Sequence, residues 1–188
     1  MCIALFSCTS STQKTAGIDA SPFRLFLKKF RPLQLPLSLR LGELEYKSLP
    51  QLDAKSADTL FIKNKDGMGI FYGMLPDTTH YFGLVVLLPG GTDCYPVLKT
   101  FDKSGKLISD ERLIDRGCGV APGLDYCSST GVIKSDLSIY CADTIKMGKV
   151  DSTFKEIEGT VEYYCSYIEG KINRDGKIIL SPEKRKNL

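Results

Sequence analysis

FGLVVLL, residues 82–88, is the core of the longest apolar run in the chain and the stretch around which the fold can be built. The run has the length of a β-strand and falls far short of the roughly 18 apolar residues of a membrane span. A strand whose successive residues are all apolar is buried on both of its faces. We therefore predict a central strand at residues 82–88, covered on each side by other parts of the structure.

Polar turns recur on either side of this run. Three of them, at residues 64–67, 102–105 and 173–176, have the same order of an Asx residue, a cation, a polar residue and glycine. This order is typical of a type I turn followed by a left-handed glycine, the usual three-residue hairpin. A fourth, degenerate turn is expected at residues 134–136. The repetition indicates either a duplicated hairpin unit or the small set of residues that such turns use.

An amphipathic pattern comes before the hairpins. Ser21 can cap a helix and Pro22 suits its first position. One face of this helix would carry Phe23, Phe26, Leu27 and Phe30. We expect the helix to cover an open end or face of a sheet, with binding to a membrane surface as the alternative. The alternating leucines of residues 37–41 predict a strand.

These patterns predict a mainly β domain that spans residues 18–188. We expect an antiparallel, hairpin-rich barrel or sandwich of about eight strands with a short N-terminal amphipathic helix. The composition, with nine Tyr, nine Phe, 17 Gly and no Trp, favours strands and turns. The net charge of +3 is spread along the chain and gives no reason to expect a nucleic-acid partner. The basic run Lys184–Lys186 is interpreted as a solvated chain end.

The tetrapeptide Leu5-Phe6-Ser7-Cys8 consists of an aliphatic residue, a tolerant position, a small residue and cysteine. It resembles the lipobox of bacterial envelope lipoproteins, in which the cysteine is lipidated and becomes the mature N-terminus. The resemblance covers these four residues, and no characterised family is recognised for residues 18–188. It implies that residues 1–17 are a lipoprotein signal remnant and tether. It further implies a membrane anchor through lipid on Cys8, in the cell envelope and facing the periplasm or the cell exterior. The alternative is a chance match, because the basic region and apolar core of a signal peptide would have to lie upstream.

Seven cysteines are many for a chain of 188 residues. If Cys8 is lipidated and the residues before it are removed, five cysteines remain, and an oxidising compartment would allow two disulfides among them. A bridge between Cys118 and Cys127 would close a loop. A bridge between Cys141 and Cys165 would join two strands whose alternation gives both cysteines apolar neighbours. Sequence spacing alone leaves the pairing open.

The stretch 116–131 is the most unusual part of the chain after its N-terminus. It contains four glycines, a proline and two cysteines in sixteen residues. Long loops of this kind are either functional or tied down. We expect either a connector closed by the Cys118–Cys127 disulfide or a rigid binding loop that presents Arg116, Asp125 and Tyr126.

No residue pattern specifies a reaction, so we assign no catalytic residue, no metal ligand and no cofactor. His80 is the only histidine, and it falls at the start of a strand where a surface position is expected. No two cysteines have the close spacing of a structural zinc site. Carboxylates such as Glu156 and Glu158 could serve acid–base chemistry only with a partner across a cleft.

The sequence therefore favours a non-enzymatic domain that binds a protein or a glycan of the cell envelope. One alternative is a carboxylate-dependent hydrolase that acts on an envelope polymer or glycan, which requires two carboxyl groups across a groove. Another is a carrier of small ligands, which requires an apolar cavity inside a closed barrel. Tyrosines gathered near the C-terminus, Tyr140, Tyr163, Tyr164 and Tyr167, would either pack a sheet or present rings for binding.

Overall fold

The computed structural model describes residues 21–62, 68–77, 79–90, 94–114 and 118–188. The lipobox with Cys8, the predicted turn at residues 64–67 and Arg116 lie outside the described residues.

The protein is mainly β, with ten strands in two antiparallel sheets and one short α-helix. The predicted fold class is therefore confirmed, and of its two forms the described residues adopt the sandwich. The elements are α1 (Pro22–Leu27), β1 (Leu37–Arg40), the 3-10 helix η1 (Ala57–Leu60), β2 (Ile70–Met74), β3 (Phe82–Pro89), β4 (Cys94–Phe101), β5 (Leu107–Arg112), β6 (Leu124–Ile133), β7 (Ser138–Met147), β8 (Glu162–Ile172), β9 (Ile178–Leu180) and β10 (Lys184–Asn187).

The two sheets follow the order of the chain closely. The first has the strand order β2-β3-β4-β5, and the second has the order β1-β6-β7-β8-β10, with β9 also paired to β8. The sheets meet where β5 lies beside β9, and the backbone N–H of Ile178 donates a hydrogen bond to the Ser109 hydroxyl across this junction at 3.3 Å. The basic run Lys184–Lys186 forms most of β10: its residues are exposed, as its charge indicated, but they pair with β8 and do not form a frayed end.

Strand β3 is the predicted central strand, paired with β2 on one side and β4 on the other. Val85 and Leu87 are fully buried in the core between the two sheets. Leu84 and Val86, on the opposite face, are equally buried in a second core. Burial on both faces is what a strand without polar positions requires.

The second core lies under α1, as the helix pattern predicted. Ser21 caps α1 by accepting a hydrogen bond from the backbone N–H of Arg24, and Pro22 is its first residue. The Phe23 ring lies 5.7 Å from the Phe82 ring and 5.5 Å from the Phe101 ring, measured between centroids. Because the apolar face of α1 packs against this sheet, the alternative of an amphipathic helix lying on a membrane is not supported.

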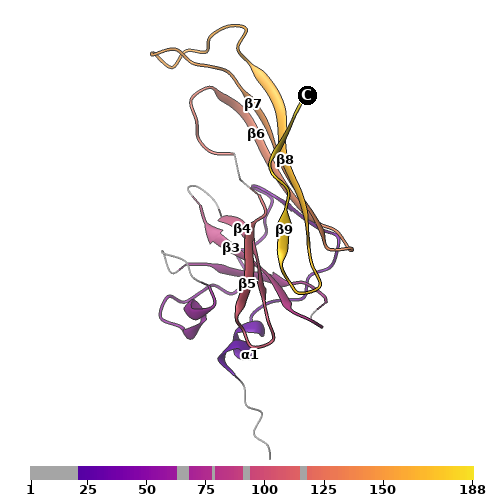
Figure 1. The fold of residues 1–188 in the computed structure, drawn as a ribbon. Coiled ribbons are helices and arrows are strands. Elements are labelled where there is room, and N and C mark those ends of the chain that lie inside the picture. Colours follow the sequence, from indigo (N-terminus) through magenta and orange to yellow (C-terminus); the bar gives the residue numbers. More distant parts are fainter. Residues whose placement is uncertain (1–20, 63–67, 78, 91–93, 115–117) are drawn as a thin grey trace, which may run out of the picture.

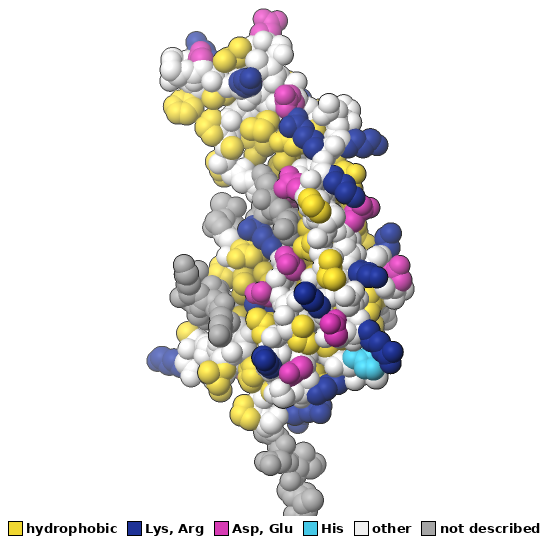
Figure 2. Space-filling model, in the orientation of Figure 1, with side chains coloured by type: hydrophobic (Ala, Val, Ile, Leu, Met, Phe, Trp, Pro, Cys, Tyr) yellow, Lys and Arg dark blue, Asp and Glu magenta, His cyan; other side chains and the backbone are white. Residues whose placement is uncertain are grey.

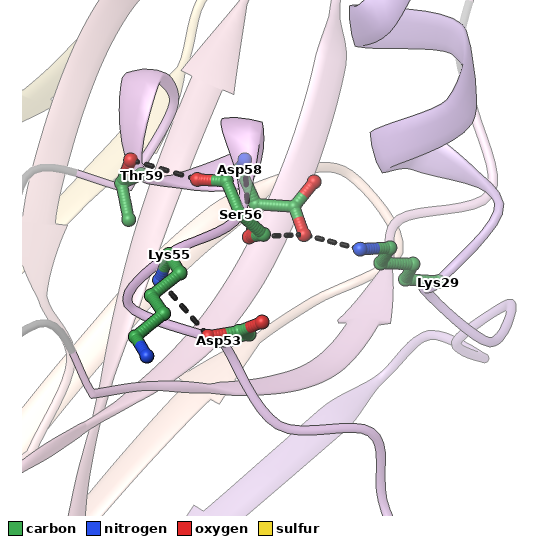
Figure 3. Close-up of polar contacts among 6 residues, drawn as sticks. All are labelled: Lys29, Asp53, Lys55, Ser56, Asp58 and Thr59. Carbon is green, nitrogen blue, oxygen red and sulfur yellow. Dashed lines mark hydrogen bonds and ion pairs between the residues drawn. The ribbon is translucent and has the colours of Figure 1, made fainter.

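A polar contact joins the end of α1 to η1 (Figure 3). The ammonium group of Lys29 points toward the buried carboxylate of Asp58, and the two form an ion pair. The Ser56 hydroxyl donates to the same carboxylate at 3.1 Å and also caps η1. A buried carboxylate needs such partners, so Asp58 holds two elements together and is not a candidate catalytic acid.

Most of the predicted turns are present. In the β4–β5 hairpin the carboxylate of Asp102 accepts the backbone N–H groups of Ser104 and Lys106, and Gly105 has a positive φ of 93°. The turn at residues 173–176 connects β8 to β9, and the degenerate turn at residues 134–136 connects β6 to β7. These turns therefore join neighbouring strands in both sheets.

Strands β6, β7 and β8 are longer than the strands of the four-stranded sheet, and together they project beyond that sheet (Figure 1). We call this projecting part, residues 124–129, 143–147 and 162–166, the ribbon. In Figure 1 the ribbon lies at the top of the molecule and α1 at the bottom, so the first described residues lie at the end opposite the ribbon. Of the helices in the described residues, none has the length and apolar character needed to cross a bilayer.

Candidate functional site

The predicted loop at residues 116–131 is half strand. Residues 124–131 belong to β6, which corrects the expectation of a loop without an element of its own. Gly131 counts toward the predicted loop, but it lies within β6 opposite Cys141. A Cβ atom on Gly131 would lie 2.7 Å from the backbone oxygen of Leu113, so glycine is required by the close approach of another segment.

The Cys118–Cys127 disulfide is present, with a Cα–Cα distance of 5.6 Å. Cys127 lies in β6 on the face that carries Ile145 of β7, which is the inner, core-facing side of the sheet. The disulfide therefore ties the segment before β6 to the inner side of the ribbon.

The structure does not form the other predicted bridge. Cys141 and Cys165 are both thiols. Cys141 pairs with Ile168, whereas Cys165 pairs with Thr144, so the two cysteines are out of register by three residues. Because successive residues of a strand point to opposite faces, Cys141 faces the core and Cys165 faces outward. Alternation along each strand predicts apolar neighbours for both cysteines, but it does not determine the register that separates them.

The outer face of the ribbon brings together two predicted site residues and two that were not assigned to the site. Tyr126 of β6 lies opposite Lys146 of β7, which in turn lies opposite Tyr163 of β8. The ammonium group of Lys146 is 2.5 Å from the carboxylate of Asp125. Tyr126 and Tyr163 are 48% and 45% exposed, and they lie near the ends of β6 and β8, beyond the residues that pair with β1 and β10. Hydrogen bonding to the Asp125 carboxylate, together with its charge, raises the pKa of Lys146 and keeps the ammonium form.

The same face continues along β7 and β8 toward the body of the molecule. The rings of Tyr140 and Tyr167 lie 5.9 Å apart, and the ammonium group of Lys184 lies 5.7 Å from the centre of the Tyr167 ring. Burial raises the pKa of the Tyr140 phenol, and the neighbouring Cys165 adds to this effect. The hydroxyl therefore remains protonated. On β7 the outward residues from Ser138 to Lys146 all retain exposure, whereas the inward ones are buried. We call the surface formed by Tyr126, Tyr140, Tyr163, Tyr167 and Lys146 the tyrosine face.

A second feature lies on the inner side of the sheet, where a hollow of about 180 Å³ opens. Its lining includes Asp143, Ile145, Tyr164, Ser166, Ile168 and Glu183. The hydroxyl of Ser129 is hydrogen-bonded to the buried carboxylate of Asp143, and that of Ser166 to the carboxylate of Glu183. Sequence reasoning missed both carboxylates, since nothing in the local pattern of either residue sets it apart from a solvated acid.

The remaining candidates have ordinary surface positions. His80 is exposed and accepts a hydrogen bond from the Arg174 guanidinium at 3.2 Å, consistent with the expected surface position. Glu156 and Glu158 lie in the exposed segment between β7 and β8 and not on one strand face. The described part of the chain contains no group of three or more His, Cys, Asp or Glu side chains arranged to hold a metal ion. A carrier of small ligands would need a closed barrel, and the two described sheets do not form one.

Comparison of the chain with models of protein families, with curated proteins and with solved structures finds no match.

Proposed function

We propose that this protein is a lipid-anchored protein of the bacterial cell envelope that binds its partner without chemical conversion, through the tyrosine face. The observation that carries the proposal is the row Tyr126–Lys146–Tyr163, in which two half-exposed aromatic rings flank one cation on the outer face of the sheet. Tyrosine combines a large apolar ring with a hydroxyl group, and for that reason it is enriched at binding surfaces. The space-filling view shows hydrophobic side chains, a class that includes tyrosine there, gathered with charged ones over the upper part of the molecule (Figure 2).

The arrangement of the molecule agrees with a tether. α1, the first described element, lies at one end, and the ribbon lies at the other (Figure 1). An anchor at Cys8 would therefore place the body of the domain next to the membrane and hold the tyrosine face away from it. The disulfide agrees with an oxidising compartment, since disulfides are rare in the cytosol.

The mass of the protein made in its native host tests the anchor. We expect a chain that begins at a diacyl- or triacyl-modified Cys8 and gains two hydrogen atoms on reduction, because the described residues hold one disulfide. A Cys8→Ser variant should lose the lipid and leave the membrane fraction. An unlipidated chain in the soluble fraction would contradict the proposed location.

A hydrolase is the second candidate, and one observation favours it: Asp143 and Glu183 line the same hollow. Hydrolysis by two carboxyl groups requires both of them. Turnover of an envelope glycan that disappears in Asp143→Asn and Glu183→Gln variants, and survives in a Tyr163→Ala variant, would favour the enzyme over the binding protein.

A further inference from the structure

We propose that the tyrosine face binds an extended anionic polysaccharide, laid across the strands of the ribbon. This inference rests on the proposed function and names the class of its ligand. It is carried by the spacing of the rings, by the charges among them and by the exposure of the rings on the outer face of the sheet.

The spacing follows from the strand register. Tyr126 and Tyr163 both lie opposite Lys146, one on β6 and one on β8, with β7 between them. Neighbouring strands are about 4.8 Å apart, so the two tyrosine positions are separated by about 9.6 Å across the sheet. Alternate sugars of a β-1,4-linked chain repeat at nearly this distance, and the C–H face of a pyranose ring packs well on a tyrosine ring. Two sugars can therefore stack on the two tyrosines while the sugar between them lies over Lys146.

The charges select an acidic polymer. The outward positions of β7, β8 and β10 carry the four cations Lys146, Lys171, Lys184 and Lys186. Three acids accompany them. Asp125 pairs with Lys146 at 2.5 Å, Glu169 pairs with Lys184 at 2.7 Å, and the charge of Glu156 also acts on Lys146. Lys186 has no carboxylate within ion-pair distance in the described part of the chain. A neutral glycan has no use for this excess of positive charge, whereas carboxylated sugars do.

The same surface argues against other ligands. Nucleic acids also combine stacking with positive charge, but the disulfide at the base of β6 indicates an oxidising compartment outside the cytosol. A compact small molecule needs a concave site that encloses it, and the tyrosine face is an open sheet. A linear polymer is the ligand that an open row of exposed rings can hold.

Binding of defined polymers to the full chain tests the inference. The probe is polymannuronate, a β-1,4-linked polymer of an acidic sugar, and the matched control is β-1,4-mannan, which has the same linkage without the carboxylate. We expect polymannuronate to bind at least tenfold more tightly than mannan and to weaken as salt is raised. The variants Tyr126→Ala and Tyr163→Ala should each lower the affinity about tenfold, while Tyr126→Phe should retain it. Phe154→Ala, which removes a 75% exposed ring outside the tyrosine face, should have no effect.

Cys165 supplies a reporter within the wild-type chain. It lies on β8 between Tyr163 and Tyr167 and faces outward with them. Bound polymannuronate should slow its alkylation by iodoacetamide severalfold, as read by peptide mass spectrometry. The buried Cys141 on the inner face should react slowly with and without polymer.

Several results would overturn the inference. Equal binding of mannan, equal binding of polyuridylic acid, or full affinity in both tyrosine-to-alanine variants would each contradict it, provided that the variants melt within a few degrees of the wild-type chain. These results leave the anchor test untouched. If no polysaccharide binds but Cys8 is lipidated and a purified envelope protein binds through Tyr126, the inference fails and the proposed function stands.

Discussion

Removal of the Cys118–Cys127 disulfide should destabilise the protein by about 2.6 kcal/mol. The two cysteines are nine residues apart. The chain-entropy relation for a loop of this length gives a loss of about 8.7 cal/mol/K in the unfolded chain, which is about 2.6 kcal/mol at 25 °C. The assay is urea denaturation of the wild-type chain and of a Cys118→Ala/Cys127→Ala double variant, followed by circular dichroism. For a domain of this size the same change lowers the melting temperature by about 5 to 10 °C.

The control is the same double variant in the presence of a reductant. Reductant should weaken the wild-type chain to the level of the double variant and leave the double variant unchanged. Two results would refute the reasoning. One is a double variant within about 0.5 kcal/mol of wild type. The other is a double variant that reductant weakens further, which would mean that a second bridge carries the stability.

Three other substitutions or conditions have expected outcomes. The phenol of Tyr81 is buried without a hydrogen-bond partner among the described residues, so Tyr81→Phe should leave the free energy of unfolding in urea unchanged or raise it by up to about 1 kcal/mol; a loss above that would reveal a partner. Gly105 has a φ of 93° and its added Cβ would lie 2.6 Å from a phenylalanine of α1, whereas Gly159 has a φ of 75° and open space around it. We therefore expect Gly105→Ala to lower the melting temperature more than Gly159→Ala, and equal losses would show that the ring moves aside. Hydrogen bonds from turn hydroxyl and backbone groups lower the pKa of Asp102 and Asp151. Because their pKa is lower when folded, the stability they contribute is present above the ordinary aspartate pKa of 3.8 and is lost as pH falls through the lowered value. Denaturation in urea between pH 5 and 2 should show this loss, with a smaller slope in an Asp151→Asn variant.

The parts of the fold that depend on local pattern could be predicted from the sequence. The apolar run at residues 82–88 specified a strand buried on both faces, and the phenylalanines near the N-terminus specified a helix that covers a sheet. The hairpin turns followed from Asx and glycine. The turn that begins at Asp151 was missed because its left-handed residue is Phe154, with a φ of 61°, and not glycine. Its hydrogen bonds are the same as those of the recognised turns, so the Asx residue was the more general signal.

The candidate site depended on pairing between strands, which the sequence did not supply. Asp125 and Tyr126 are predicted as parts of a loop, but they lie in β6, where Asp125 pairs with Lys146 of β7 and Tyr126 lies opposite it. Lys146 carries no local signal at all. It belongs to the site because a β-bulge between Leu124 and Tyr126, which adds one residue to β6, places Tyr126 opposite Lys146. A shift of the β6 pairing by one residue would turn Tyr126 inward.

The ribbon combines features that together favour a surface exposed for binding. Long strands that project beyond a sandwich expose backbone and side chains on two faces, and contacts outside the two cores must help to hold such a ribbon in place. The disulfide at Cys127 ties down its inner side, and ion pairs from Arg185 to Glu162 at 2.5 Å and from Lys184 to Glu169 at 2.7 Å hold β10 against its edge. The Arg185 guanidinium also lies 3.6 Å from the centre of the Tyr164 ring on the inner side. The disulfide and the Arg185–Glu162 pair stiffen the ribbon from its inner side, whereas the Lys184–Glu169 pair lies on the outer face where β10 meets β8. Tyr126 and Tyr163 remain exposed, so they can meet a ligand at little cost in ordering.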